Sequence, residues 1–175
     1  DHCSIPAGTI HCSGKDTMVL EISSSPCIFT FKLWDWGRLG LDGKPRPINI
    51  DRGMENIQWD KQTEWIMNTC ACKPTLEEKD QYHTEEHTGL NYLEYLETRR
   101  IWMNKKTWHN TGNETNALCL VEGSEAVIES PYNEFEPYVI HFAESTCIPA
   151  TIRNYTIAPH GESVGKEIAV VKTFV

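Results

Sequence analysis

Long hydrophobic runs are absent from this sequence, and so is any surplus of basic residues. No apolar run among the 175 residues approaches the roughly 18 to 20 that cross a bilayer, so we expect no membrane partner. With 16 Lys and Arg against 25 Asp and Glu, the formal net charge is −9. A surface of that sign repels phosphate backbones, and we therefore expect no nucleic acid partner. A few local cations can still hold a small anion such as a sugar phosphate.

A secretory signal, an internal repeat and a low-complexity tract are absent as well. No basic segment followed by a short apolar segment opens the chain, so we expect a cytoplasmic protein. The chain starts with Asp1 rather than Met, and we expect further sequence upstream of it.

The seven cysteines do not by themselves indicate a disulfide framework. Their number is odd, and a chain of this length can bury a core without covalent cross-links. Four of them lie in apolar or strand-like surroundings, and we expect buried thiols at Cys12, Cys27, Cys119 and Cys147. A secreted, disulfide-linked β-protein stays open as an alternative, which a count of free thiols would exclude.

The first third of the chain predicts two strands and a loop. TMVLEIS (17–23) and CIFTFKLW (27–34) are rich in β-branched and aromatic residues, and the second alternates apolar with polar positions. A loop dense in Gly and Pro follows at 35–47. Asp51 is then placed to cap a short helix over 52–59, and a second short helix is possible over 61–68. We interpret the polar stretch up to residue 95 as a connector.

The second half predicts a sheet structure. Short apolar runs separated by turn residues recur from residue 96 to the end, a spacing typical of a β-sandwich or barrel. We also expect a hairpin around Glu122-Gly123-Ser124-Glu125. The expected strands are LETRRIWM, ALCLVEG, EAVIES, PYVIHFA, STCIPA, NYTIAP and IAVVKTFV.

The stretch IPAGTIHCSG, residues 5–14, is a candidate metal site. Pro6 fixes a backbone angle, Gly8 permits a tight bend, and His11 follows at the start of an expected strand. A neutral imidazole on such a strand can bind zinc, although a lone His beside a turn is more often structural.

P-A-G-x-x-H resembles the second cupin motif. The longer run through VLEIS, FTFKLWDWGRLGLDGKPRP and INIDRGMENI, residues 5–58 in all, resembles the type I (class I) mannose-6-phosphate isomerases, and residues 96–175 are similar to their second cupin-like domain. The resemblance implies an all-β, cupin-like double-stranded β-helix (jelly roll) with a partly helical connector. It divides the chain into final strands of a first barrel (1–34), the connector (35–95) and a second cupin-like domain (96–175).

The same resemblance implies a zinc site and a catalytic cation. His11 matches the last of the family's four zinc ligands, whereas the other three belong to sequence that would precede this chain. Lys32 stands where the family carries a catalytic Arg, and either cation could stabilise developing negative charge. Arg38, Lys44 and Arg46 form a basic loop that could position phosphate, although a solvated turn is the simpler interpretation.

A competing motif lies in the connector. His83-Thr84-Glu85-Glu86-His87 fits H-x-x-E-H, in which two His four residues apart on a helix hold zinc. Gly89 follows closely and no apolar periodicity precedes it, so we expect no helix here and no metalloprotease.

Our leading hypothesis is the C-terminal part of a zinc-dependent isomerase of mannose 6-phosphate, with an incomplete active site in this chain alone. The alternative is a non-catalytic, cupin-like sugar-binding or regulatory module. Expected partners are a sugar phosphate and, through exposed strand edges, a second copy of the chain.

Overall fold

The computed structural model describes residues 2–23, 30–71, 73–89 and 91–175. The chain divides into two compact units, each of which is described by itself. The β unit comprises Asp1–Ser4 and Ala71–Val175, and the N-terminal unit comprises Ile5–Cys70. Among the described residues, no helix has the length and apolar character needed to cross a membrane.

The N-terminal unit contains short helices and long irregular segments. Helix α1 spans Ile50–Met54, α2 spans Thr63–Trp65, and the π-helix η1 continues it over Ile66–Cys70. The helix expected over 52–59 is therefore shorter and begins earlier, with Asp51 in its first turn rather than at its cap. The helix expected over 61–68 is confirmed within about two residues at each end, the usual uncertainty of element boundaries.

The two strands expected over 17–34 are wrong wherever the structure describes them. Residues 17–23 and 30–34 pair with no strand, and residues 24–29 lie outside the described part. High β-propensity reflects a fit to neighbouring strands, and the described residues of this unit supply no such neighbour. The one β-bridge found among the described residues of the unit joins Leu39 to Pro45.

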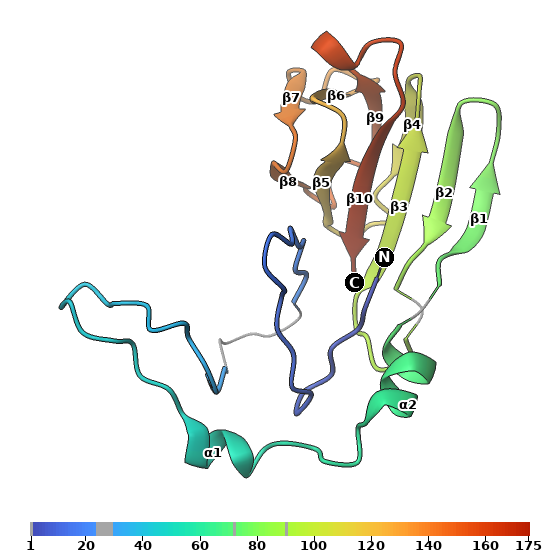
Figure 1. Ribbon diagram of the computed structural model, residues 1–175. Coiled ribbons are helices and arrows are strands. Elements are labelled where there is room, and N and C mark those ends of the chain that lie inside the picture. The colour runs from blue at the N-terminus through green and yellow to red at the C-terminus, as the bar shows by residue number, and fades with distance from the viewer. Residues whose placement is uncertain (1, 24–29, 72, 90) are drawn as a thin grey trace. The chain divides into compact units, whose positions relative to one another are not determined.

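The β unit is a sandwich of two antiparallel sheets. The larger sheet has the order β1-β2-β3-β10-β5-β8, and the smaller has the order β4-β9-β6-β7 (Figure 1). The strands are β1 (Thr75–Lys79), β2 (His83–His87), β3 (Glu97–Met103), β4 (Thr107–Asn110), β5 (Asn116–Glu122), β6 (Glu125–Glu129), β7 (Tyr138–His141), β8 (Ser145–Ile148), β9 (Asn154–Pro159) and β10 (Ile168–Phe174).

Strand pairing in the β unit is nested. β6 pairs with β7, β5 with β8, β4 with β9, and β3 with β10, all antiparallel. This is the pattern of one long hairpin rolled into two sheets, which defines a jelly roll. The jelly-roll architecture expected for the second half is confirmed, and each of its seven expected strands is present.

The hairpin of β1 and β2 corrects the interpretation of residues 71–95 as a connector. β2 pairs with β3 and β1 pairs with β2, so both strands enlarge the bigger sheet (Figure 1). TLEEK and HTEEH lack the apolar alternation of a half-buried strand, and all five residues of β1 are exposed. The β unit accordingly begins at Ala71, well before the boundary expected at 96.

The turn at Glu122–Glu125 also differs from expectation. β5 and β6, which flank it, belong to different sheets, so they do not form a hairpin. Gly123 has φ +98°, a conformation that side chains disfavour, and a Cβ there would lie 2.5 Å from Ile168 Cγ2. The turn therefore carries the chain from one layer of the sandwich to the other.

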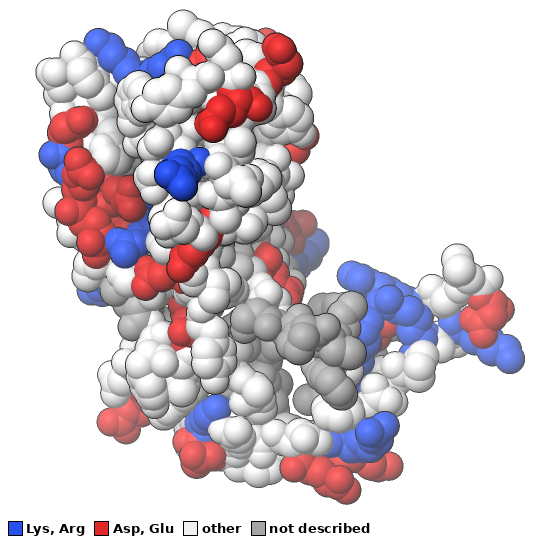
Figure 2. Space-filling view, turned by 180° about the vertical axis from the view of Figure 1, so that it is seen from behind, with Lys and Arg blue, Asp and Glu red and all other residues white. Residues whose placement is uncertain are grey.

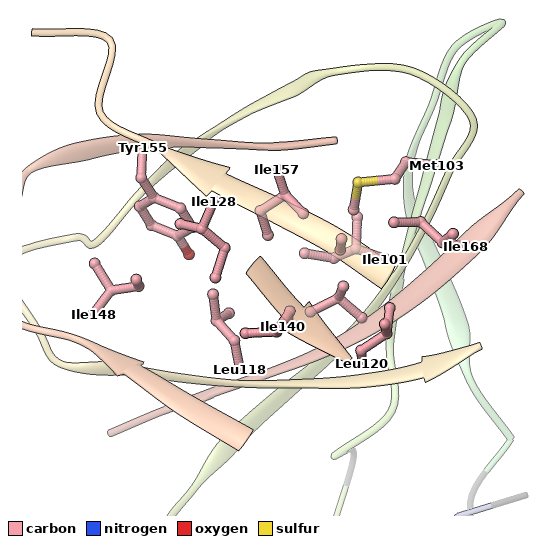
Figure 3. Close-up of a cluster of buried hydrophobic side chains, with 12 residues drawn as sticks. Ile101, Met103, Leu118, Leu120, Ile128, Ile140, Ile148, Tyr155, Ile157 and Ile168 are labelled. Atoms are coloured by element: carbon pink, nitrogen blue, oxygen red, sulfur yellow. The ribbon is translucent and has the colours of Figure 1, made fainter. Parts of the chain in front are cut away.

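The core of the β unit lies between its two sheets. Side chains from both layers converge there, as Figure 3 shows. The largest contributors with almost no exposed surface are Ile101, Met103, Leu118, Leu120, Ile128, Ile140, Tyr155, Ile157, Ile168 and Val170. The Tyr155 hydroxyl is buried with them and donates to Asn116 Oδ1 at 3.0 Å, so its polar end is satisfied.

The expected burial of the cysteine thiols is only partly correct. Cys119 is buried, whereas Cys12 and Cys147 are exposed, and Cys27 lies outside the described residues. Cys12 lies in a segment without strand pairing, and Cys147 lies in the edge strand β8. At such positions an apolar sequence context does not ensure burial.

Candidate functional site

The sequence P-A-G-T forms a tight turn ahead of His11. Thr9 N–H donates to Pro6 O at 3.1 Å, and Gly8 adopts φ +79° at the third position of the turn. That position requires a positive φ in a type II turn, which explains the glycine. His11 is exposed after the turn, and its Nδ1 lies 3.0 Å from Thr9 O.

The turn packs on residues 56–61 of the same unit. Gln58 N–H donates to Gly8 O at 3.1 Å, and Lys61 Nζ donates to Ala7 O at 3.3 Å. A Cβ on Gly8 would lie 2.8 Å from Gln58 Cγ and 2.9 Å from Asn56 O, so only glycine allows this approach. A shallow cleft of about 390 Å³ lies alongside, lined in part by Thr9, Ile10, Ile57, Trp59 and Met67.

The described residues do not form a zinc site around His11. Nowhere in the described ranges do three His, Cys, Asp or Glu side chains gather closely enough to hold a metal ion. A structural zinc needs about four protein ligands and a catalytic one about three plus water. His11 contributes one imidazole, and His2 is engaged with Glu94 Oε1 at 3.1 Å.

A buried carboxylate organises the predicted cations. Asp35 is 8% exposed, and it accepts from Arg46 Nε at 2.6 Å and from Arg46 Nη2 at 2.7 Å. Lys32 Nζ lies 3.7 Å from Asp35 Oδ1. The Arg46 hydrogen bonds lower the pKa of Asp35, and the positive charges of Arg46, Lys32 and Arg38 act in the same direction. The carboxylate therefore stays ionised and holds two cations together.

Local backbone contacts fix this arrangement. Asn49 N–H donates to Lys32 O at 2.7 Å, and Arg46 N–H donates to Arg38 O at 2.9 Å, which closes the basic loop into a small hairpin. About a third of the Lys32 and Arg46 side chains remains exposed, 36% and 38%, so solvent and small anions can reach both.

The structure thus brings together some of the predicted site residues and separates others. Lys32, Arg38 and Arg46 surround Asp35 and carry a surplus of positive charge, which suits a phosphate or a developing oxyanion. Lys44 is exposed and its backbone N–H donates to Asp42 Oδ1 at 3.1 Å. No hydrogen bond or ion pair among the described residues joins His11 to this cluster.

Sequence reasoning missed Asp35. It stands at the end of an aromatic run, FTFKLWD, directly before the loop that carries Arg38 and Arg46. An acidic residue between an expected strand Lys and a basic loop is the signal that could have identified it, since a lone carboxylate there must pair with one of those cations.

The H-x-x-E-H pentapeptide is strand β2, not a helix, which excludes the inverted zinc-protease arrangement. In a strand, His83 and His87 lie about 13 Å apart, too far to share one zinc ion. Glu86 points to the opposite face, where its Oε2 accepts from Arg100 Nε at 2.7 Å and from Trp102 Nε1 at 3.0 Å.

Surface charge adds little to the search for a site. Figure 2 shows one face on which acidic and basic side chains are interspersed, with acidic groups widespread over it. Such a mixed surface does not point to a polyanionic partner.

Comparisons with known proteins relate this chain to mannose-6-phosphate isomerases. No family model matches the sequence. It is 35% identical over 57 residues to the probable mannose-6-phosphate isomerase GmuF of Bacillus subtilis (strain 168), which covers 33% of this chain and 18% of that protein. It is 22% identical over 139 residues to mannose-6-phosphate isomerase ManA of the same strain, which covers 75% of this chain and 39% of ManA.

The structural comparison confirms the fold class. The crystal structure of the mannose 6-phosphate isomerase from Bacillus subtilis matches 81% of this chain with a TM-score of 0.57 at 14% identity. The cupin-like jelly roll expected from the sequence is therefore the fold of this protein. The chain spans about two fifths of the length of that structure, 39%.

Proposed function

We propose that this chain is the C-terminal part of a zinc-dependent aldose–ketose isomerase that interconverts mannose 6-phosphate and fructose 6-phosphate. The observation that carries the proposal is the sequence likeness to the two Bacillus subtilis proteins, at 35% identity in its best stretch. The cation cluster around Asp35 supports it, because a sugar phosphate needs positive charge both for its phosphate and for the oxyanion of the reaction.

In this proposal the N-terminal unit is the last portion of a first cupin barrel. Many of its apolar side chains are exposed, including Met18, Val19, Trp34, Trp36 and Leu41. Apolar side chains in such numbers are normally covered, and a large exposed patch marks an interface. Residues that precede Asp1 in the whole protein would cover them and would supply the metal ligands that accompany His11.

The residues of this chain then have distinct roles. His11 contributes one imidazole to the metal site. Lys32 places a positive charge near the reacting oxygens, and Asp35 acts as a positioning residue because it holds Lys32 and Arg46 beside each other. Arg38, Lys44 and Arg46 attract the substrate phosphate. The proton transfer between C1 and C2 needs a base, for which the described residues offer no distinct candidate.

The role of Lys32 can be tested in the whole protein with matched substitutions. Lys32→Met should lower kcat strongly, whereas Lys15→Met should leave it unchanged, because the Lys15 side chain is 90% exposed and its ammonium lies 4.0 Å from Asp16 Oδ2. Lys32→Arg should retain more activity than Lys32→Met, since it keeps the charge. Equal activity of Lys32→Met and the unmodified protein would contradict the role of Lys32.

A non-catalytic sugar-binding or regulatory module is the second candidate. The observation in its favour is that His11 has no companion metal ligands among the described residues. Binding of mannose 6-phosphate by the whole protein without turnover, and without bound zinc, would favour this candidate over the isomerase.

A further inference from the structure

Strand β2 presents titratable side chains to the inside of the β unit. His83, Glu85 and His87 lie directly opposite Met103, Ile101 and Arg99 in the pairing of β2 with β3. Residues directly opposite each other in an antiparallel pair point to the same face of the sheet. Because Ile101 and Met103 belong to the core, the three β2 side chains point to the core side as well.

These side chains lie at an open edge of the sandwich. β4 is an edge strand of the smaller sheet, since it pairs only with β9 among the described strands, whereas the larger sheet continues past β3 through β2 and β1 (Figure 1). His109 of β4 faces inward and is 7% exposed, and its ring centroid lies 6.5 Å from that of His83. The polar side chains of β2 and β4 therefore lie close together at the edge of the sandwich, where the smaller sheet ends and the larger sheet continues.

Lys172 of β10 is directed to the same interior. It lies opposite Arg99 of β3 and Leu118 of β5, and Leu118 is a core residue. The residue is 9% exposed, yet its ammonium makes no hydrogen bond or ion pair with any described residue; its nearest aromatic contact is the Phe174 ring, 5.5 Å away. A largely buried ammonium without a protein partner is costly, and such groups normally have one.

Glu85 is the complementary group. Its carboxylate has one neighbour within ion-pair distance, His83 Nε2 at 3.9 Å, and accepts no hydrogen bond from the described residues. Burial lowers the pKa of Lys172, while the charge of Glu85 raises it, so the two groups lie within electrostatic range of each other. The Glu85 side chain is 20% exposed and Lys172 is 9% exposed, so both groups border solvent.

Neighbouring charged groups on this face lie within ion-pair distance of one another, although His87 Nε2 and Glu97 Oε2 make no hydrogen bond among the described residues. Arg99 lies 3.2 Å from Glu77 and 3.4 Å from Glu97, and His87 Nε2 lies 3.0 Å from Glu97. His109 Nε2 lies 2.8 Å from Thr107 Oγ1. We name His83, Glu85, His109 and Lys172 the β2 cluster; within it, the Glu85 carboxylate and the Lys172 ammonium are the two charged groups without a hydrogen-bond partner among the described residues.

We propose that the β2 cluster binds a small hydroxylated anion, the carboxylate or phosphate of a sugar derivative, with Lys172 holding the anionic oxygen and Glu85 accepting from a hydroxyl. A bare anion fits less well because Glu85 repels it. A metal cation fits less well because Lys172 repels it and no three ligands gather among the described side chains. This site belongs to the β unit and is separate from the isomerase site proposed above.

The test is a titration of the 175-residue chain followed by NMR of the Met103 and Ile101 methyl groups and of the lysine side-chain signals. The probes are gluconate, mannose 6-phosphate, inorganic phosphate and mannose. Gluconate or mannose 6-phosphate should shift the Met103, Ile101 and Lys172 signals and raise the pKa of Lys172, because the bound anion stabilises the ammonium. Which of the two binds more tightly distinguishes a carboxylate from a phosphate ligand, and inorganic phosphate and mannose should bind at least about tenfold more weakly.

Substitutions show whether binding takes place at the β2 cluster. Lys172→Met and Glu85→Gln should each weaken binding about tenfold or more, as expected for loss of a hydrogen bond to a charged group. Lys166→Met, at an exposed position of the same unit, should not. If Lys172→Met fails to fold, two other measurements still test the site: weaker binding by Glu85→Gln, and a rise in the pKa of Lys172 when the probe binds to the unmodified chain.

Two results would overturn the proposal. One is the absence of any shift at Met103, Ile101 and Lys172 with all four probes. The other is mannose 6-phosphate binding that survives Lys172→Met and disappears in Lys32→Met, which would place binding in the N-terminal unit and leave the proposed isomerase function intact.

Discussion

His109 should make the stability of the β unit depend on pH. Its imidazole is 7% exposed and packs against Tyr155, with ring centroids 5.5 Å apart. Burial lowers the pKa of His109 from 6.5 to about 3, and electrostatic interactions with Lys172 and His83 act in the same direction. The folded protein therefore keeps this side chain neutral at every pH above about 3.

The sign and size of this pH dependence follow from proton binding by His109. Below pH 6.5 an unfolded chain takes up a proton on this histidine and the folded chain does not, so the free energy of unfolding falls as the pH falls. The loss is about 1.4 kcal/mol per pH unit, or about 2 kcal/mol between pH 6.5 and pH 5. The contribution of His109 is complete above pH 6.5 and is lost progressively down to about pH 3.

The assay is urea unfolding of the unmodified chain and of His109→Gln at pH 7.5 and pH 5.0. Glutamine can still bond to Thr107 but does not titrate, so the contributions of the other six histidines cancel in the comparison. The stability of the unmodified chain relative to His109→Gln should fall by about 2 kcal/mol at the lower pH. His160→Gln, at an exposed position of the same unit, is the matched control. An identical difference at both pH values would refute the reasoning.

Three further substitutions test contacts inside the β unit and inside the N-terminal unit. Ile157→Ala removes a fully buried side chain and should lower the free energy of unfolding by about 2–5 kcal/mol in denaturant melts, while Val164→Ala, 68% exposed, should change it little. Gly8→Ala forces a side chain into a conformation with φ +79° and should cost about 1–2 kcal/mol, seen as faster hydrogen exchange of the Gln58 amide. Arg46→Lys removes the two-pronged contact to Asp35 and should raise the pKa of that carboxyl toward its usual range, measured by carboxyl NMR; an unchanged pKa would contradict the assigned cause.

The apolar strands of the β unit could be predicted because their alternation is set by burial on one face. β9 and β10 show this, since both cross the core and both stand out as apolar runs in the sequence. β1 and β2 could not be found in this way, because β1 has no buried residue and β2 presents polar side chains to the interior.

Strand pairing between residues far apart in the chain could not be predicted from the sequence either. The run at 17–23 has strand-like composition, but composition does not reveal whether a neighbouring strand is available. The turn at Gly123 looked like a hairpin because its flanking runs are strands, and only the three-dimensional arrangement shows that they enter different sheets. For the candidate site, the cations were named from a resemblance, whereas the carboxylate of Asp35 that gathers them was not.

The most direct test of the proposed function compares this 175-residue chain with the whole protein that contains it. Zinc content and a coupled assay of mannose 6-phosphate isomerisation would be measured on both, and on the whole protein with His11→Ala. The short chain should bind zinc poorly and show no turnover, because the described residues offer His11 without companion ligands. The whole protein should carry about one zinc per chain and be active, and His11→Ala should abolish turnover while leaving the β unit folded. Turnover with bound zinc in the short chain, or an active whole protein unaffected by His11→Ala, would contradict the account.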